Sequence, residues 1–92
     1  MAGYYIISVN CGTRPVPNDA IQNVLNAQED WLRFGGDTYY VFSRVMTARQ
    51  LYDQIKPVLH GDDFILVSNA NVADLYGWGT QMVVDWFAKS RP

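Results

Sequence analysis

The 92-residue sequence has little of the residues that hold small proteins together by covalent or metal bonds. It contains one cysteine, Cys11, and one histidine, His60. A single cysteine excludes an intrachain disulfide framework, and one cysteine with one histidine excludes a four-ligand zinc site. The apolar run at residues 64–67 is far shorter than the roughly 20 residues that span a bilayer. We therefore expect no disulfide, no metal site and no transmembrane helix.

Basic residues are not in excess either. Seven Lys and Arg stand against nine Asp and Glu, which gives a formal net charge of -2. Because attraction to phosphate backbones depends on a surplus of Lys and Arg, strong sequence-independent DNA binding is not expected. The first residues carry no basic segment of a secretory signal, and the cysteine content suits a reducing compartment. The expected location is the cytoplasm, away from membranes.

Length and composition indicate one globular domain over residues 1–92. The apolar share is 49% and the charged share 17%, which excludes intrinsic disorder. A chain of this size buries only a little over ~60% of the surface that it exposes when unfolded. Self-association is therefore expected, because it buries additional surface of each chain.

Aromatic and β-branched residues predict strands over residues 4–9, 38–43 and 64–68. The segment 31–34 has two interpretations: a strand before a hairpin turn at Gly35 and Gly36, or the end of a longer helix. The first gives the order β-α-β-β-α-β-α, an α+β, ferredoxin-like βαββαβ sandwich with an added C-terminal helix. The second gives β-α-β-α-β-α.

Apolar residues at helical spacing predict three helices. The first begins near Asn18 as its N-cap, the second follows a capping box that starts at Thr47, and the third follows Thr80. Pro57 is expected to bend or shorten the second helix, and Gly61 is expected to end it in the left-handed conformation.

The predicted strands are apolar at consecutive positions instead of alternating positions, so both faces of the sheet are expected to be buried. Two helices cover one face, and the other face requires either the last helix or a second subunit. A homodimer that packs through Tyr4, Tyr40 and Phe42 is the favoured interpretation. The alternative, base stacking on these aromatic residues as in an RNA-recognition sheet, normally comes with a basic surplus that this chain lacks.

Several short motifs together resemble the small bacterial SinR-like proteins, which are related to the ferredoxin-like small subunit of the CRISPR spacer-integration complex. These motifs are Ser8-Val9-Asn10, Trp31-Leu32, Thr38-Tyr39-Tyr40-Val41, Thr47-Ala48, Leu59-x-x-Asp62-Asp63, Tyr76-Gly77-Trp78-Gly79 and Asp85-Trp86-Phe87. The resemblance implies a βαββαβ fold that dimerises through the sheet. It also raises the question of nuclease activity, because many members of the wider superfamily bind a divalent metal with an aspartate at the end of the first strand. Here that position is Asn10, which supplies no negative charge.

No catalytic cluster stands out in the sequence, and neither a catalytic residue nor a cofactor is expected. Asp62 and Asp63, beside His60, are typical of a helix end and turn. Cys11 lacks the surroundings of a known cysteine nucleophile, so we interpret it as a buried thiol. Arg14 is one of the basic residues proposed as phosphate contacts.

The other candidate contacts are with partners. Arg14 and Arg33 are the two hypothesised phosphate contacts, and through them weak binding of a nucleic acid stays an open alternative. Tyr76 and Trp78 lie between glycines, and aromatic anchors of this kind dominate interaction hot spots. They are predicted to bind a protein partner, although packing of Trp78 beside the last helix is the alternative.

The favoured hypothesis is a small, non-catalytic, homodimeric ferredoxin-like binding or regulatory protein that acts by contact with another macromolecule. A rival hypothesis is a divalent-metal-dependent nuclease in which Asp62 or Asp63 compensates for Asn10. A third is a protein inhibitor of mobile-element or defence machinery, a role that a small acidic domain fills by protein contact. The partner itself is not specified by the sequence.

Overall fold

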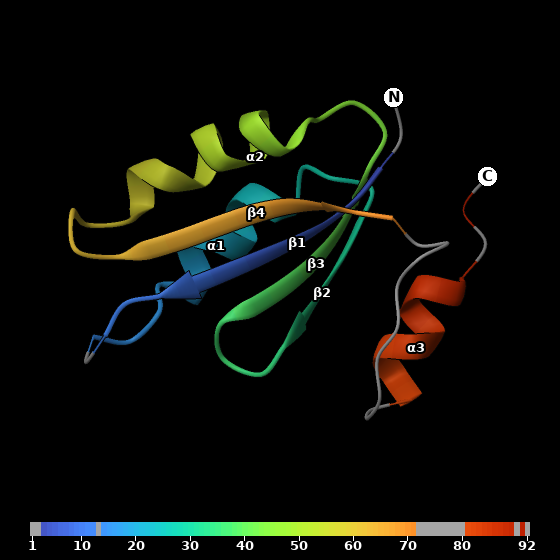
Figure 1. Ribbon diagram of the computed structural model, residues 1–92, viewed down its shortest axis with the longest axis horizontal. Coiled ribbons are helices and arrows are strands. Elements are labelled where there is room, and N and C mark those ends of the chain that lie inside the picture. Colours follow the sequence, from blue (N-terminus) through green and yellow to red (C-terminus); the bar gives the residue numbers. More distant parts are fainter. Residues whose placement is uncertain (1–2, 13, 72–80, 90, 92) are drawn as a thin grey trace.

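The computed structural model describes residues 3–12, 14–71, 81–89 and 91. In this part of the chain the fold is α+β, with a four-stranded antiparallel sheet and three α-helices (Figure 1). The elements, in chain order, are β1 (Gly3–Asn10), α1 (Asn18–Leu25), β2 (Asp30–Phe34), β3 (Thr38–Ser43), α2 (Ala48–Ile55), a 3₁₀ turn η1 (Lys56–Val58), β4 (Phe64–Ala70) and α3 (Gln81–Ala88).

The strands lie in the order β2-β3-β1-β4, and each neighbouring pair is antiparallel. Residues 31–34 belong to β2, so the interpretation as a strand is confirmed and the longer first helix is wrong. The hairpin between β2 and β3 turns at Gly35, whose φ of 69° is open to glycine at little cost. The order β-α-β-β-α-β-α is therefore present, and it is compatible with the expected ferredoxin-like fold.

The start of α1 differs from the prediction. Pro17, not Asn18, is the N-cap residue, and no side chain caps the helix. Asn18 is already helical, and its side-chain oxygen accepts a hydrogen bond from the hydroxyl of Tyr39. The expected N-cap was wrong because Asn18 hydrogen-bonds to β3, a contact that local spacing does not reveal.

The two ends of α2 give one confirmation and one correction. The capping box is present: the Thr47 hydroxyl accepts from the Gln50 backbone, and the Gln50 side chain accepts from the Thr47 backbone. The α-helix ends at Ile55 and continues as the 3₁₀ turn that contains Pro57, as expected. Gly61 does not adopt a left-handed conformation; among the described glycines only Gly12 and Gly35 do.

The chain after η1 turns by a different device from the predicted glycine cap. Leu59, the C-cap of η1, is extended. The His60 amide then donates a hydrogen bond of 2.7 Å to Oδ2 of Asp63, and the Asp63 amide donates to the His60 carbonyl at 3.0 Å. An aspartate side chain therefore closes the turn that leads into β4, in line with the interpretation of these acids as turn residues.

The core lies between one face of the sheet and the helices α1 and α2. Alternate residues of β1 and β3 point into it, as the period of a strand requires. Its fully buried apolar side chains are Ile7, Val9, Ile21, Leu25, Tyr39, Val41, Leu51 and Ile55. Cys11, 9% exposed, closes the same core at the end of β1, as expected for a buried thiol.

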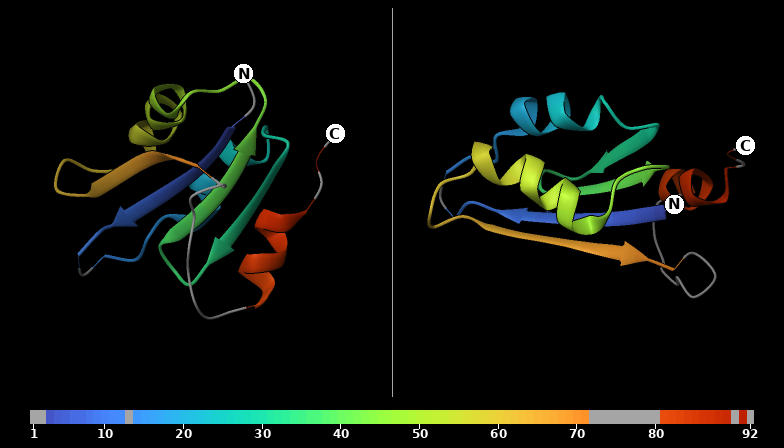
Figure 2. Two further views of the ribbon diagram at one scale, coloured as in Figure 1. Left: turned by 45° about the vertical axis from the view of Figure 1, so that its right-hand side comes forward. Right: turned by 90° about the horizontal axis from the view of Figure 1, so that it is seen from above.

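The opposite face of the sheet is partly covered by α3, which Figure 2 shows well apart from α1 and α2. Trp86 and Phe87 of α3 contact the aromatic residues of β1 and β3. The last helix therefore supplies part of the cover that the apolar strands predicted. None of the helices in the described residues combines the length and apolarity that a bilayer crossing requires.

Candidate functional site

Five aromatic rings form a cluster where α3 meets the sheet: Tyr4, Tyr40, Phe42, Trp86 and Phe87. We call it the aromatic cluster. Ring centroids are 4.9 Å apart between Tyr4 and Phe42, 5.1 Å between Tyr40 and Phe87, and 4.9 Å between Trp86 and Phe87. The last two pairs are edge-on, an arrangement favoured by the ring quadrupole. The contact between α3 and the sheet is therefore made largely of aromatic rings.

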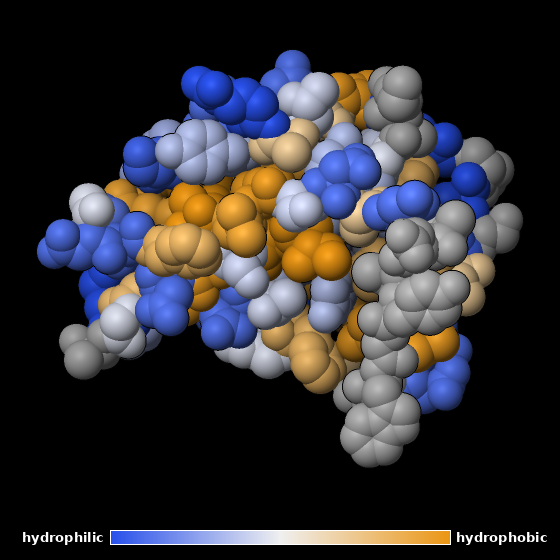
Figure 3. Space-filling model, viewed as in Figure 1, coloured by the Kyte–Doolittle hydropathy of each residue, from blue (hydrophilic) through white to orange (hydrophobic). Residues whose placement is uncertain are grey.

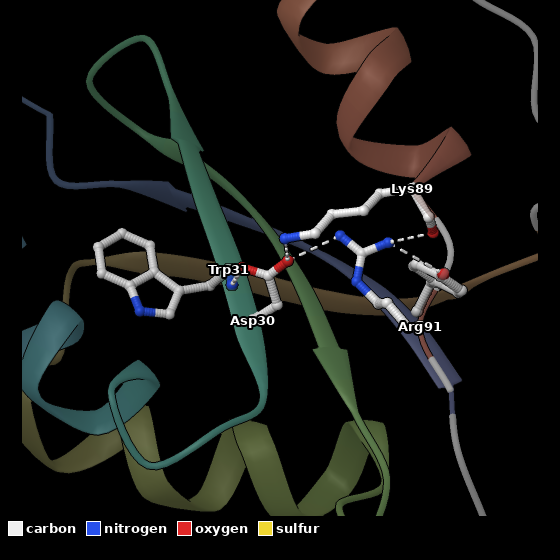
Figure 4. Close-up of polar contacts among 5 residues, drawn as sticks. Asp30, Trp31, Lys89 and Arg91 are labelled. Carbon is white, nitrogen blue, oxygen red and sulfur yellow. Dashed lines mark hydrogen bonds and ion pairs between the residues drawn. The ribbon is translucent and has the colours of Figure 1, made fainter.

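Arg91 completes this contact. Its side chain is only 6% exposed, and its guanidinium carbon lies 4.3 Å from the ring centroid of Trp86 and 5.4 Å from those of Tyr4 and Phe42. The guanidinium also donates to Oδ2 of Asp30 at 2.8 Å (Figure 4). A desolvated cation stacked on rings and paired with a carboxylate connects the end of the chain to β2.

The charge on Asp30 is adapted to this arrangement. Burial alone raises the pKa of the Asp30 carboxyl, but the hydrogen bond from Arg91 and the charges of Lys89 and Arg91 outweigh burial and hold the pKa below its usual range. Lys89 Nζ lies 3.5 Å from the same carboxylate oxygen. Asp30 is therefore ionised at neutral pH and holds two cations that follow α3.

The residues predicted for a dimer face, Tyr4, Tyr40 and Phe42, all belong to the aromatic cluster. Tyr4 and Tyr40 contact rings of α3 in the same chain, and Phe42 is 5% exposed beneath Arg91. Tyr4 and Tyr40 remain partly exposed beside α3. Their role in a dimer stays a prediction.

Away from α3, the same face of the sheet leaves large apolar side chains exposed. Phe34 on β2 is 39% exposed, and Phe64 and Leu66 on β4 are 53% and 56% exposed. In the strand register, Leu66 lies opposite Ser8 and Phe64 opposite Asn10. Figure 3 shows apolar surface over the region where Figure 1 draws β4. Exposed apolar side chains that gather on one face are typical of an interaction surface.

A second polar group lies at the end of the sheet where β1 ends. Arg14 forms an ion pair with the Asp63 carboxylate, whose side chain is 4% exposed, and donates a 3.6 Å hydrogen bond to Sγ of Cys11. The His60 backbone hydrogen bond, followed by the interactions with Arg14, lowers the pKa of Asp63 despite its burial. Burial first, and then the Asp63 charge, raise the pKa of the Cys11 thiol. The neutral thiol is not activated as a nucleophile.

The two arginines proposed as phosphate contacts are not adjacent. Arg14 lies next to Asp63, which precedes the edge strand β4, whereas Arg33 is on β2, the opposite edge strand. The strands β1 and β3 lie between them. The exposed Arg33 lies opposite Tyr39 in the strand register, and its charge partly offsets the rise that burial gives the pKa of the Tyr39 hydroxyl. The Arg14 guanidinium is occupied by an internal carboxylate.

Asn10, the residue at the position where the resemblance implies an aspartate, has a structural role. Its Oδ1 accepts a 2.8 Å hydrogen bond from the amide of Gly12. Gly12 lies just after the end of β1 and has a φ of 62°. The described residues contain no group of three or more His, Cys, Asp or Glu side chains that could hold a metal ion. Tyr76 and Trp78, predicted to bind a partner, lie outside the described residues.

Comparison of the chain with models of known protein families, with curated proteins and with solved structures finds no match.

Sequence reasoning missed the ion pairs of Arg91 with Asp30 and of Arg14 with Asp63. Arg91 and Asp30 are 61 residues apart, and Arg14 and Asp63 are 49 apart. No spacing rule links residues so distant, because only the strand order brings them together. The one local signal was the run of apolar residues, several of them aromatic, at consecutive strand positions. It indicated that the second face of the sheet needs a cover, but it did not indicate the ion pairs.

Proposed function

We propose that this chain is a small, non-catalytic, ferredoxin-like protein that works as a homodimer and acts by contact with another macromolecule. The function is the one implied by the resemblance to SinR-like proteins and the CRISPR-integration small subunit. Support for the fold comes from the strand order β2-β3-β1-β4, its antiparallel pairs and the packing of α1 and α2 on a single face. This is the arrangement expected when a βαββαβ chain forms one sheet.

The observation that carries the proposal is the exposed apolar surface on the second face of the sheet. Phe64 and Leu66 remain more than half exposed although they point to the same side as the aromatic cluster. Burial of such side chains against a partner is favourable by roughly 25 cal/mol per Å² of apolar area. An exposed apolar surface of this kind supports a function in binding.

The test compares what the chain captures in an extract of its host with and without this surface. We expect the double variant Phe64→Ser/Leu66→Ser to lose macromolecules that the unmodified chain retains. The matched control is Val45→Ser, since Val45 is 71% exposed but lies between β3 and α2. Equal capture by all three proteins, at equal folded fraction by circular dichroism, would reject the proposed surface.

The rival nuclease hypothesis is tested separately. We expect no cleavage of labelled single- or double-stranded DNA or RNA with magnesium or manganese, because Asn10 supplies no charge and Asp63 is paired with Arg14. Cleavage that persists through purification and disappears in Asp62→Ala or Asp63→Ala would overturn the non-catalytic proposal. Activity gained only in Asn10→Asp would indicate descent from a nuclease.

A further inference from the structure

The two edges of the sheet differ in how well they are protected against pairing with another strand. The edge strand β2 is five residues long and carries Asp30 and Arg33. It is in contact with α3, and Lys89 and Arg91, which follow α3, pair with Asp30. Charged residues, shortness and a covering element are the usual protections of an edge strand. β2 has all three.

The other edge strand, β4, has none of these protections among the described residues. It is seven residues long, Phe-Ile-Leu-Val-Ser-Asn-Ala, and contains neither a charged residue nor a proline. In the described part of the chain it pairs only with β1, so its outer backbone groups face no strand. Figure 2 shows β4 at the margin of the sheet, on the side away from β2. Such an edge is a template for strand addition.

The side chains of β4 are arranged so that the strand complements a second copy of itself. On the exposed face the large residues Phe64 and Leu66 come first, and the small residues Ser68 and Ala70 follow. An antiparallel pair centred on Val67 places Phe64 opposite Ala70 and Leu66 opposite Ser68. Each large side chain then faces a small one, and no like charges face each other.

We propose that two copies of this chain pair antiparallel along β4, about a two-fold axis at Val67, and so join their sheets into one. This deepens the homodimer of the proposed function and rests on it. The register is specific, because a centre at Val67 uses all seven residues, whereas a centre at Leu66 leaves Asn69 and Ala70 without partners. A two-fold contact of this kind is closed, so it ends at a dimer.

The experiment measures the dimer dissociation constant by sedimentation across a concentration series. The unmodified protein is expected to shift with concentration from the 10.5 kDa chain to twice that mass. Leu66→Lys and Ser68→Glu, both at exposed positions, are each expected to weaken the dimer by roughly tenfold or more, since each places a charge at the unprotected edge. Circular dichroism and thermal unfolding confirm that each variant is folded.

Mixing the two variants tests the register. In a mixed dimer the introduced lysine at 66 faces the introduced glutamate at 68, and the second contact remains the native pair of Leu66 and Ser68. The mixture is therefore expected to associate more tightly than either variant alone. Val45→Lys, at a position that is 71% exposed and lies between β3 and α2, is the control and is expected to leave the dissociation constant unchanged.

A dimer that persists in Leu66→Lys and Ser68→Glu, or that Val45→Lys weakens equally, overturns the pairing along β4 but leaves the homodimer standing. A mixture that associates no better than its components also overturns the proposed register. An unmodified chain that stays monomeric at every concentration overturns both this inference and the homodimer of the proposed function.

Discussion

The two faces of the sheet are covered by different means. On the first face, α1 and α2 bury aliphatic side chains completely, with Ile7, Leu25 and Leu51 at 0% exposure. On the second face, α3 buries none of its residues fully and is held by aromatic rings and Arg91. The first contact depends mainly on apolar area, with one hydrogen bond from Tyr39 to Asn18, whereas the second also depends on a buried charge and its partner.

The second contact also carries a cost that the first lacks. Nε1 of Trp86 and Nε of Arg91 are buried without a hydrogen-bond partner among the described residues. An unsatisfied buried donor costs about 1–3 kcal/mol, which offsets part of what the ring contacts contribute. We infer that α3 separates from the sheet at a lower free energy than the core opens, as peripheral elements commonly do.

The largest effect is expected from a cavity in the first face. Leu51→Ala should lower the free energy of unfolding by about 2–5 kcal/mol, because Leu51 is fully buried between α2 and the sheet. Urea unfolding followed by circular dichroism measures this. Gln54→Ala, at an exposed position of the same helix, is the control and should change stability by less than about 0.5 kcal/mol.

A smaller loss is expected from the second face. Trp86→Ala should cost about 2 kcal/mol, less than a comparable core truncation, because Trp86 is only partly buried. Val84→Ala on the outer side of α3, where Val84 is 51% exposed, should have little effect. Urea midpoints for the two variants make the comparison. A loss from Trp86→Ala as large as that from Leu51→Ala would contradict the distinction between the faces.

The ionised Asp30 carboxylate, which pairs with Lys89 and Arg91, predicts that the free energy of unfolding depends on pH. Because the pKa of Asp30 is lower in the folded protein than in the unfolded chain, its contribution is complete above the ordinary aspartate pKa of about 3.9 and is lost as the pH falls through the folded value. Urea midpoints at a series of acidic pH values measure this loss. Asp30→Asn should flatten the curve in that range. Asp63 also has a lowered pKa, so Asp63→Asn should remove a separate part of the stability loss at acidic pH.

The smallest effect is an expected absence of change. Cys11 belongs to the core of the first face; the residue is 9% exposed, and the pKa of its thiol is raised. Alkylation near neutral pH should therefore be slow and should follow opening of the core. If α3 separates independently, Arg91→Ala should leave the alkylation rate of Cys11 nearly unchanged, while Leu51→Ala should increase it. A parallel increase in both variants would show that the faces open as one unit.

Much of the architecture was predictable because it depends on local patterns. The strand 38–43 was predicted with its observed bounds, and the capping box at Thr47 and the break near Pro57 were also correct. These features depend on propensity, on hydrogen bonds three residues apart and on a missing backbone donor. The errors at Asn18 and Gly61 have the opposite cause. The hydroxyl of Tyr39 engages the Asn18 side chain, and the side chain of Asp63 closes the turn that Gly61 was expected to make.

The candidate surfaces were only partly predictable. Consecutive apolar residues showed that the second face of the sheet needs a cover, but they did not distinguish α3 from a second subunit. The residues Tyr4, Tyr40 and Phe42 were singled out correctly as members of one face, while the exposed Phe64 and Leu66 were assigned only to a strand. The exposure of Phe64 and Leu66 depends on how far the contact between α3 and the sheet extends, which is a property of the folded chain.

The sequence by itself determined the alternation of strands and helices, the two apolar sides of the sheet and the neutral residue at position 10, because each depends on residue type and short spacing. The tertiary structure alone decided that Arg91 pairs with Asp30 across 61 residues and that β4, not β2, is the edge strand left without a cover by the described residues. The physical reason is that strand order and ion pairing depend on distances in space, which the chain acquires only when the sheet forms.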